Sequence, residues 1–244
     1  LESYQKINSP AYIACLKQCC IFAAKIKQFN KAQEALEQLR KMFHDKLTSK
    51  YVFEKSLVFI SFIEAETRLT LIDHNLDRLN KSQAKTIQEI ESFDKMYDGE
   101  SKMIIYFNLS IRLMLLNDFK GAFRWLEKII HEHHGMRVDI LEDAHILSLV
   151  CIYEIDSVNL FQSRERSYLR HYQTQQEKRK GDNMEVYIKI IHLLAQVYQY
   201  KNNLENVRKN LAELELYVAD KIEKNDVDHL LGETMLAWIK NKGR

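Results

Sequence analysis

The chain has 244 residues, of which only 6 are Gly and 1 is Pro, and this shortage of turn-forming residues disfavours an all-β protein or an enzyme built from glycine-rich loops. Hydrophobic residues make up 46% of the chain and charged residues 29%, which predicts a folded protein with a substantial core. The formal net charge of +2 is far below that of a dedicated nucleic-acid binder.

Apolar residues recur at helical spacing along almost the whole chain, and no sustained period-2 alternation predicts a strand. Short polar breaks separate the helical segments. In chain order, the predicted helices are 10–28, 31–46, 50–73, 82–97, 101–116, 119–134, 137–155, 158–180, 184–201, 204–224 and 227–241. The predicted fold class is therefore all-α, with five helix pairs and one further helix.

The sequence favours a soluble protein of the cytoplasm. No apolar run approaches the roughly 18 residues of a membrane span. The four cysteines, Cys15, Cys19, Cys20 and Cys151, lie in apolar helical patterns and are too few to stabilise a secreted fold by disulfide bonds. We therefore predict that they pack in the core in a reducing compartment. An opening Leu1 in place of Met is what a fragment of a longer protein would show.

The segment 108–129 contains the clearest candidate for a repeated unit. Its markers are the pair Leu109-Ser110, then Leu113, the turn Asn117-Asp118, the aromatic Phe119, the small Ala122, and finally Leu126 and Ile129. Small residues let two helices approach closely while large ones fill the surrounding space. This pattern resembles a tetratricopeptide repeat, a pair of antiparallel helices that stacks with its neighbours into a solenoid.

Weaker matches to the same pattern lie around 19–39, 147–168 and 194–214. The apolar residues that follow the turns are Phe29, Leu76, Phe119, Val158 and Leu204, at intervals of 47, 43, 39 and 46 residues. These intervals exceed the family repeat of about 34 residues. The resemblance implies a single domain over 1–244, folded as a right-handed α-solenoid of about five helix pairs with elongated helices or connections.

The C-terminal segment 226–241 is predicted to be a capping helix. Its apolar stripe consists of Leu230, Leu231, Met235, Trp238 and Ile239. Asn225 or Asp226 is the predicted N-cap, and Gly243 follows the helix end. A cap is needed because the last pair of a solenoid otherwise exposes its stacking face. The alternative is that Trp238 docks on a partner or on a second copy of the chain.

The resemblance also implies a binding surface, because in that family the first helix of each pair lines a concave face that holds a peptide or partner helix. Carried over to this chain, the surface consists of Ile104, Phe107, Asn108, Ile111 and Met114 in the clearest unit and Lys189, His192, Gln196, Gln199 and Tyr200 in the last one. Asn108 stands where the family often uses an amide to bind peptide backbone. Burial of the same apolar residues by neighbouring pairs is the alternative, and the sequence leaves both open.

Metal and catalytic sites are not favoured. His131, Glu132, His133 and His134 precede Gly135, an arrangement that suits a helix C-terminus. Glu142 and His145 form a single Glu-x-x-His, whereas a di-iron site needs two. Polar residues on a solvent-facing helix side are the preferred interpretation of this pair. No nucleophile elbow or phosphate-binding loop is present, so we expect neither an enzyme nor a cofactor.

The predicted helix 158–180 is rich in basic residues between positions 163 and 180, with Tyr168 and Tyr172 interleaved. Guanidinium groups and aromatic rings in this pattern can contact phosphates and stack on bases. A solvated outer face of a repeat helix has the same composition. This segment is where we would expect an acidic partner or weak nucleic-acid binding.

These patterns together predict a non-catalytic scaffold that binds a peptide or partner helix in the concave face of a solenoid. Two alternatives remain. One is a ligand-sensing regulatory domain of a larger signalling or transcription-regulating protein, and the other is weak nucleic-acid binding through 163–180.

Overall fold

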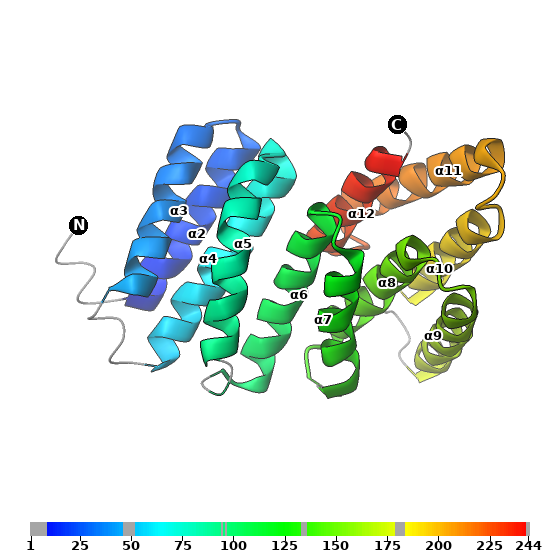
Figure 1. Ribbon diagram of the computed structural model, residues 1–244, viewed down its shortest axis with the longest axis horizontal. Coiled ribbons are helices and arrows are strands. Elements are labelled where there is room, and N and C mark those ends of the chain that lie inside the picture. The colour runs from blue at the N-terminus through cyan, green and yellow to red at the C-terminus, as the bar shows by residue number, and fades with distance from the viewer. Residues whose placement is uncertain are drawn as a thin grey trace. The chain divides into compact units, whose positions relative to one another are not determined.

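The computed structural model describes residues 9–45, 52–93, 95, 97–132, 136–178 and 184–242. Within these residues there are eleven helices and no strand, so the predicted all-α class is confirmed (Figure 1). The helices are α2 (Ser9–Lys25), α3 (Phe29–His44), α4 (Val52–Asp73), α5 (Leu76–Phe93), α6 (Gly99–Leu115), α7 (Phe119–Glu132), α8 (Val138–Ile155), α9 (Val158–Lys178), α10 (Met184–Gln199), α11 (Leu204–Glu223) and α12 (His229–Lys242). None of these helices combines the length and apolar character needed to cross a bilayer.

One helix boundary differs clearly from the prediction. Helix α5 begins at Leu76, although the polar residues before position 82 were expected to form a long break. Asn75 caps the helix, because its Oδ1 accepts a hydrogen bond of 3.1 Å from the backbone N of Arg78. The Arg78 guanidinium in turn donates to Asp73 Oδ2 at 2.6 Å. These polar residues therefore start the helix and do not interrupt it.

The same turn recurs along the chain. The five apolar residues expected to follow the turns are the first residues of α3, α5, α7, α9 and α11. In four of these cases the residue two positions earlier is in the left-handed region, namely Lys27 (φ 60°), His74 (φ 55°), Asn117 (φ 61°) and Asp156 (φ 62°). A left-handed residue at this place ends a helix and lets the next one begin at once.

The chain divides into two compact units, unit 1 (Leu1–Arg112) and unit 2 (Leu113–Arg244), with the boundary inside α6. In unit 1, α2 packs on α3 and α4, and α3 also packs on α4 (Figure 1). The rings of Phe43 and Phe59 lie 4.8 Å apart between α3 and α4. Arg112 is fully buried, and its guanidinium donates to Glu66 Oε2 of α4 at 2.5 Å and to Ser82 Oγ of α5 at 2.9 Å. A buried ion pair therefore links α6 to α4 and α5.

Helix α8 is the central helix of unit 2. It contacts α7, α9, α10 and α12, and every residue from Ile140 to Tyr153 is buried. Helix α10 packs on α9 and α11 as well. A helix that is buried all round needs no polar face, which explains the nearly continuous apolar sequence from 146 to 153.

The C-terminal helix α12 packs on α11 and α8. Its N-cap is Asp228, whose Oδ1 accepts a hydrogen bond of 2.7 Å from the backbone N of Leu230. The predicted caps were wrong, because Asn225 is in the left-handed region and Asp226 is bonded to Lys221 Nζ at 3.0 Å. Trp238 is buried against its own chain, where its Nε1 donates to Glu154 of α8.

Gly232 allows α12 to approach α11 closely, because a Cβ at this position would overlap the side chain of Ile222. We expect Gly232→Ala to lower the free energy of unfolding by about 1–3 kcal/mol, as overpacking typically does. Urea unfolding followed by tryptophan fluorescence would measure the change. Gly121→Ala is the comparison, since the added Cβ would meet only the Asp118 carboxylate. Its cost is limited to the helix cap that Asp118 Oδ1 forms by accepting a hydrogen bond of 2.9 Å from Gly121 N, about 1 kcal/mol. An equal loss of stability in both variants would contradict this account.

Candidate functional site

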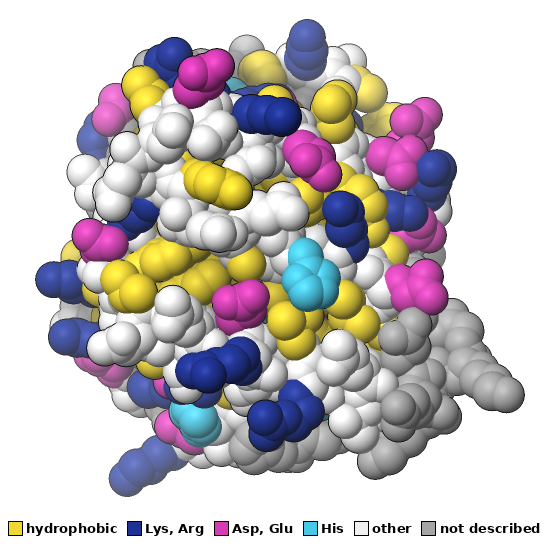
Figure 2. Space-filling model, turned by 90° about the vertical axis from the view of Figure 1, so that its right-hand side faces the viewer, with side chains coloured by type: hydrophobic (Ala, Val, Ile, Leu, Met, Phe, Trp, Pro, Cys, Tyr) yellow, Lys and Arg dark blue, Asp and Glu magenta, His cyan; other side chains and the backbone are white. Residues whose placement is uncertain are grey.

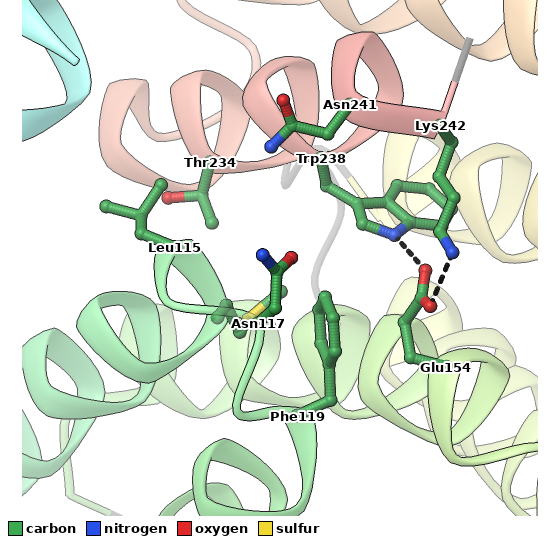
Figure 3. Close-up of a pocket in the computed structure, with 9 residues that line it drawn as sticks. Leu115, Asn117, Phe119, Glu154, Thr234, Trp238, Asn241 and Lys242 are labelled. Atoms are coloured by element: carbon green, nitrogen blue, oxygen red, sulfur yellow. Dashed lines mark hydrogen bonds and ion pairs between the residues drawn. The ribbon is translucent and has the colours of Figure 1, made fainter. Parts of the chain in front are cut away.

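A pocket of about 300 Å³ lies in unit 2, where the turn between α6 and α7 faces α12 (Figure 3). It is lined by Met114, Leu115, Asn117, Phe119, Glu154, Thr234, Trp238, Asn241 and Lys242. Its walls are apolar or aromatic, and its polar groups are two amides, a hydroxyl, a carboxylate and an ammonium group. Such a mixture of apolar walls and a few convergent polar groups is typical of binding sites.

The α6–α7 turn positions one of the two amides. Asn117 is in the left-handed region, and hydrogen bonds from Asn117 N to Met114 O (2.9 Å) and from Asp118 N to Leu113 O (2.8 Å) hold this conformation. The Asn117 side chain points from the turn into the pocket, and Asn241 of α12 lies across from it (Figure 3). The pocket thus carries amide groups on two separate elements.

Glu154, near the end of α8, joins this helix to α12. Its Oε1 accepts a hydrogen bond of 2.6 Å from Trp238 Nε1, and its Oε2 lies 2.6 Å from Lys242 Nζ (Figure 3). The Glu154 side chain is only 10% exposed, whereas that of Lys242 is 39% exposed. The Trp238 and Tyr153 rings also pack edge to face, with centroids 5.6 Å apart. These charge-assisted contacts place a nearly buried carboxylate in the pocket wall.

A second lysine lies at the same end of α8. Lys201 Nζ donates to Tyr153 O at 2.9 Å and to Asp156 Oδ1 at 2.9 Å, and it lies 4.8 Å from the centre of the Tyr153 ring. Unpaired carbonyls make the C-terminus of a helix electronegative. This end of α8 therefore holds cations from two other segments of unit 2.

The first predicted set of binding residues is largely buried. Phe107, Asn108, Ile111 and Met114 are buried, and Ile104 is half-buried. The Nδ2 of Asn108 donates to Ile104 O at 2.9 Å, so the donor group of this amide is used within its own helix, while its Oδ1 is buried without a hydrogen-bond partner among the described residues. Of the five residues, only Met114 lines the pocket. The structure thus does not present this set as an open surface.

The second predicted set is exposed. Lys189, His192, Gln196, Gln199 and Tyr200 are all exposed, at the three- and four-residue spacing of a single stripe along α10 and its C-terminal end. None of them lines the pocket. Figure 2 shows the side of the molecule on which α9, α10 and α11 lie in Figure 1, where positive and negative side chains are mixed with hydrophobic patches. This face carries no single-sign electrostatic field.

The tyrosines of the basic helix α9 are not available for base stacking, so that part of the nucleic-acid interpretation is wrong. Tyr168 and Tyr172 are buried, and the OH of Tyr172 donates to Glu142 O at 3.0 Å. Burial raises the pKa of Tyr168 to about 12. Arg164 donates to Glu127 Oε2 at 2.5 Å. The side chain of Lys178 and residues 179–180 lie outside the described residues.

The solvent-facing interpretation of Glu142 and His145 is also wrong. Both are buried, because neighbouring helices cover α8 on all sides. The His145 ring stacks on Tyr168 with centroids 4.2 Å apart, and its Nδ1 lies 3.3 Å from the OH of Tyr172. Between them in sequence, Asp143 accepts a hydrogen bond of 2.9 Å from the OH of Tyr187. These side chains form a buried polar network between α8, α9 and α10.

The cysteines divide into two classes. Cys20 and Cys151 are buried as predicted, but Cys15 and Cys19 are exposed, so the prediction of core packing was wrong for these two. Their Sγ atoms lie 4.0 Å apart. Helix α2 is apolar on nearly all sides, so periodicity alone does not show which side is covered.

Part of the histidine cluster falls outside the described residues, namely His133, His134 and Gly135. His131 and Glu132 are exposed, and His131 Nε2 lies 3.1 Å from Glu127 Oε2 of the same helix. In the part of the chain that the structure describes, no group of three or more His, Cys, Asp or Glu side chains could hold a metal ion.

Comparisons of the chain with protein-family models, with curated proteins and with solved structures found no match. The function is therefore inferred from the site. The residues expected to bind a partner included none of its five polar residues, which are Asn117, Glu154, Thr234, Asn241 and Lys242. No local sequence pattern could have indicated that these residues lie in one pocket, since residues that meet there, such as Trp238 and Glu154, are 84 residues apart.

Proposed function

We propose that the chain is a non-catalytic interaction domain that binds a peptide segment of a partner protein in the cytoplasm. Its fold would be a right-handed solenoid of about five helix pairs, similar to tetratricopeptide repeats. The recurring left-handed turn before α3, α5, α7 and α9 supports this proposal. So does the packing within unit 2, where α10 contacts both the helix before it and the helix after it.

The observation that carries the binding function is the pair of amides, Asn117 and Asn241, on opposite sides of the pocket (Figure 3). A carboxamide both donates and accepts hydrogen bonds, so it matches the N–H and C=O groups of a peptide backbone. Met114, Leu115 and Phe119 provide apolar contact for a side chain. At about 300 Å³, the pocket is near the lower end of the range for small-ligand sites, and it suits one or two side chains.

The exposed stripe of α10 would contact other parts of the same partner. Lys189 and His192 provide groups that can donate hydrogen bonds, and Gln196 and Gln199 provide amides. Lys189 Nζ lies 3.6 Å from Glu213 Oε1 in an exposed ion pair. Water or a group of a partner can replace this contact at little cost in free energy.

A selection from a random peptide library on the whole chain tests this proposal. We expect selected peptides to bind the Asn241→Ala variant about tenfold more weakly, because their backbone groups would lose a hydrogen-bonding partner. Asn117→Gly should have a similar effect, and Gly is chosen because Asn117 has φ 61°. Fluorescence polarisation with a labelled peptide measures the affinities.

Asn202→Ala is the matched control, since Asn202 is an exposed asparagine of a turn that does not line the pocket. The Asn202→Ala variant should bind the selected peptides with the same affinity as the unaltered chain. Failure to enrich any peptide would refute the proposed function. If enriched peptides bind Asn241→Ala and Asn117→Gly as tightly as they bind Asn202→Ala, the peptides bind outside this pocket.

A further inference from the structure

The pocket already holds a cation that belongs to the chain itself. Lys242 comes from the end of α12 and places its ammonium group against the Glu154 carboxylate. It also lies 6.0 Å from the centre of the Tyr153 ring. A carboxylate beside aromatic rings is a favourable environment for a positive charge. Lys242 thus shows which kind of group this part of the pocket accepts.

The site favours cations for a second, independent reason. The last turn of α8 also binds Lys201, through Tyr153 O, the Asp156 carboxylate and the Tyr153 ring. Lys242 at the end of α12 and Lys201 in the turn between α10 and α11 therefore both lie at the electronegative end of α8. An anionic ligand would be repelled by Glu154 if it displaced Lys242.

Another cation can replace Lys242 at the Glu154 carboxylate. The Lys242 side chain is 39% exposed and sits at the last residue of its helix, where helices fray. Its long stem carries several rotatable bonds, so holding it in one geometry costs conformational entropy. Glu154, in contrast, is nearly buried and keeps its second hydrogen bond, from Trp238, when Lys242 leaves.

We propose that the pocket binds the guanidinium group of an arginine side chain of the partner peptide, which replaces Lys242 on Glu154. This inference rests on the proposed peptide-binding function and names the residue that would anchor the peptide. It also makes Lys242 an internal competitor for the site.

Arginine fits this pocket better than lysine or a neutral side chain. Its planar fork has five N–H donors, so a guanidinium that pairs with the Glu154 carboxylate still has donors to offer to the side-chain oxygens of Asn117 and Asn241, which line the same pocket. Its apolar stem can pack on Phe119 and Trp238, and a guanidinium group also stacks on aromatic faces. Lysine has a compact ammonium group with three donors, so it would satisfy fewer of these groups at once.

Nuclear magnetic resonance offers a direct test, because the chain has only two tryptophans. Trp238 lines the pocket and donates to Glu154, whereas Trp125 does not line the pocket and serves as an internal reference. Titration with N-acetyl-argininamide should shift the indole N–H signal of Trp238 in a saturable way and leave that of Trp125 unchanged. N-acetyl-norleucinamide, which has an apolar stem and no charge, should cause no comparable shift.

Two variants should change this affinity in opposite directions. Lys242→Met removes the competitor and should tighten the binding of N-acetyl-argininamide several-fold, while Glu154→Gln should weaken it at least tenfold. Lys240→Met is the matched control, because it removes the same charge from an exposed position of α12 that does not line the pocket. Unchanged or weaker binding to Lys242→Met, or an equal gain in Lys240→Met, would overturn the proposal.

The outcomes also separate this inference from the proposed function. Selected peptides that depend on Asn241 but lack arginine would overturn the arginine anchor and leave peptide binding in place. If no peptide is selected, peptide binding fails, and with it the role of the pocket as an arginine anchor. If the selected peptides are enriched in arginine and bind Lys242→Met more tightly than the unaltered chain, the result supports both peptide binding and the arginine anchor.

Discussion

Replacing Arg112 by Met is expected to lower the free energy of unfolding by about 3–5 kcal/mol, the cost of leaving a buried charge without its partner. Arg112 and Glu66 are both almost completely inaccessible to solvent. Burial lowers the pKa of Arg112 from its ordinary value, and the Glu66 carboxylate acts in the opposite direction. The guanidinium also bonds to Gln83, Ser82 and Thr86 of α5, so several polar groups lose a partner at once.

A second substitution separates loss of the charge pair from loss of packing. Glu66→Leu combined with Arg112→Met removes both charges, and apolar replacement of a whole buried pair is often nearly neutral. We therefore expect the double variant to recover the part of the loss that is due to the unpaired Glu66 carboxylate, while Gln83 Oε1 still lacks its Arg112 donor. Chemical unfolding followed by circular dichroism gives these values.

Arg137→Met is the control for Arg112→Met, since Arg137 forms an exposed pair with Asp139 at 2.5 Å. Exposed pairs contribute about 0–1 kcal/mol. A loss at Arg112 as small as that at Arg137 would contradict the account of a buried ion pair.

The replacement Asp143→Asn is expected to stabilise unit 2 increasingly as the pH rises. Burial raises the pKa of Asp143 well above its ordinary value, and nearby Asp228, Asp139 and Glu142 raise it further. The hydrogen bond from Tyr187 acts in the opposite direction. The folded state thus binds this proton more tightly than the unfolded state, whose aspartate has a pKa of about 3.9.

The sign of the pH dependence follows from this difference. The stability that Asp143 contributes is fully present below the unfolded pKa and is lost as the pH rises through the folded pKa. In that window the gain from Asp143→Asn should grow by about 1.4 kcal/mol per pH unit. Urea unfolding of both proteins at pH 5, 6 and 7 measures the slope.

A matched control for this slope is Asp220→Asn, since the Asp220 side chain is 46% exposed in an ion pair with Lys224. Its hydrogen bond with Lys224 lowers the pKa of Asp220, so its contribution to stability is lost only as the pH falls below the ordinary range for aspartate. The effect of Asp220→Asn should therefore stay constant between pH 5 and pH 7. A constant effect of Asp143→Asn over the same range would show that its carboxyl group is not held protonated in the folded state.

The sequence by itself determined the helices of this protein. Helix formation depends on neighbours three and four residues apart and on capping and turn residues, and all of these are local. Each predicted helix has a counterpart among the described residues, and the residues expected after the turns, such as Phe119 and Val158, begin α7 and α9. Helix α5 was predicted too late because the polar residues near its start act as caps, and caps resemble loop residues in sequence.

Only the tertiary structure decided which faces of the helices are covered. Cys15 and Cys19 of α2 are exposed, whereas Glu142 and His145 of α8 are buried, the reverse of what the sequence predicted in both cases. Periodicity locates a core face only when a helix has a distinct polar side. Helices α2 and α8 are apolar on nearly all sides, so their neighbours determine what is exposed.

The tertiary structure also assembled the candidate site. Glu154 meets Trp238 across 84 residues of sequence, and the Asn117 turn lines the same pocket as Asn241. Such pairs depend on how helices pack and on where α12 returns to α8, neither of which leaves a local signal in the sequence. The sequence therefore specified the helices and their turns, while packing between distant helices created the pocket.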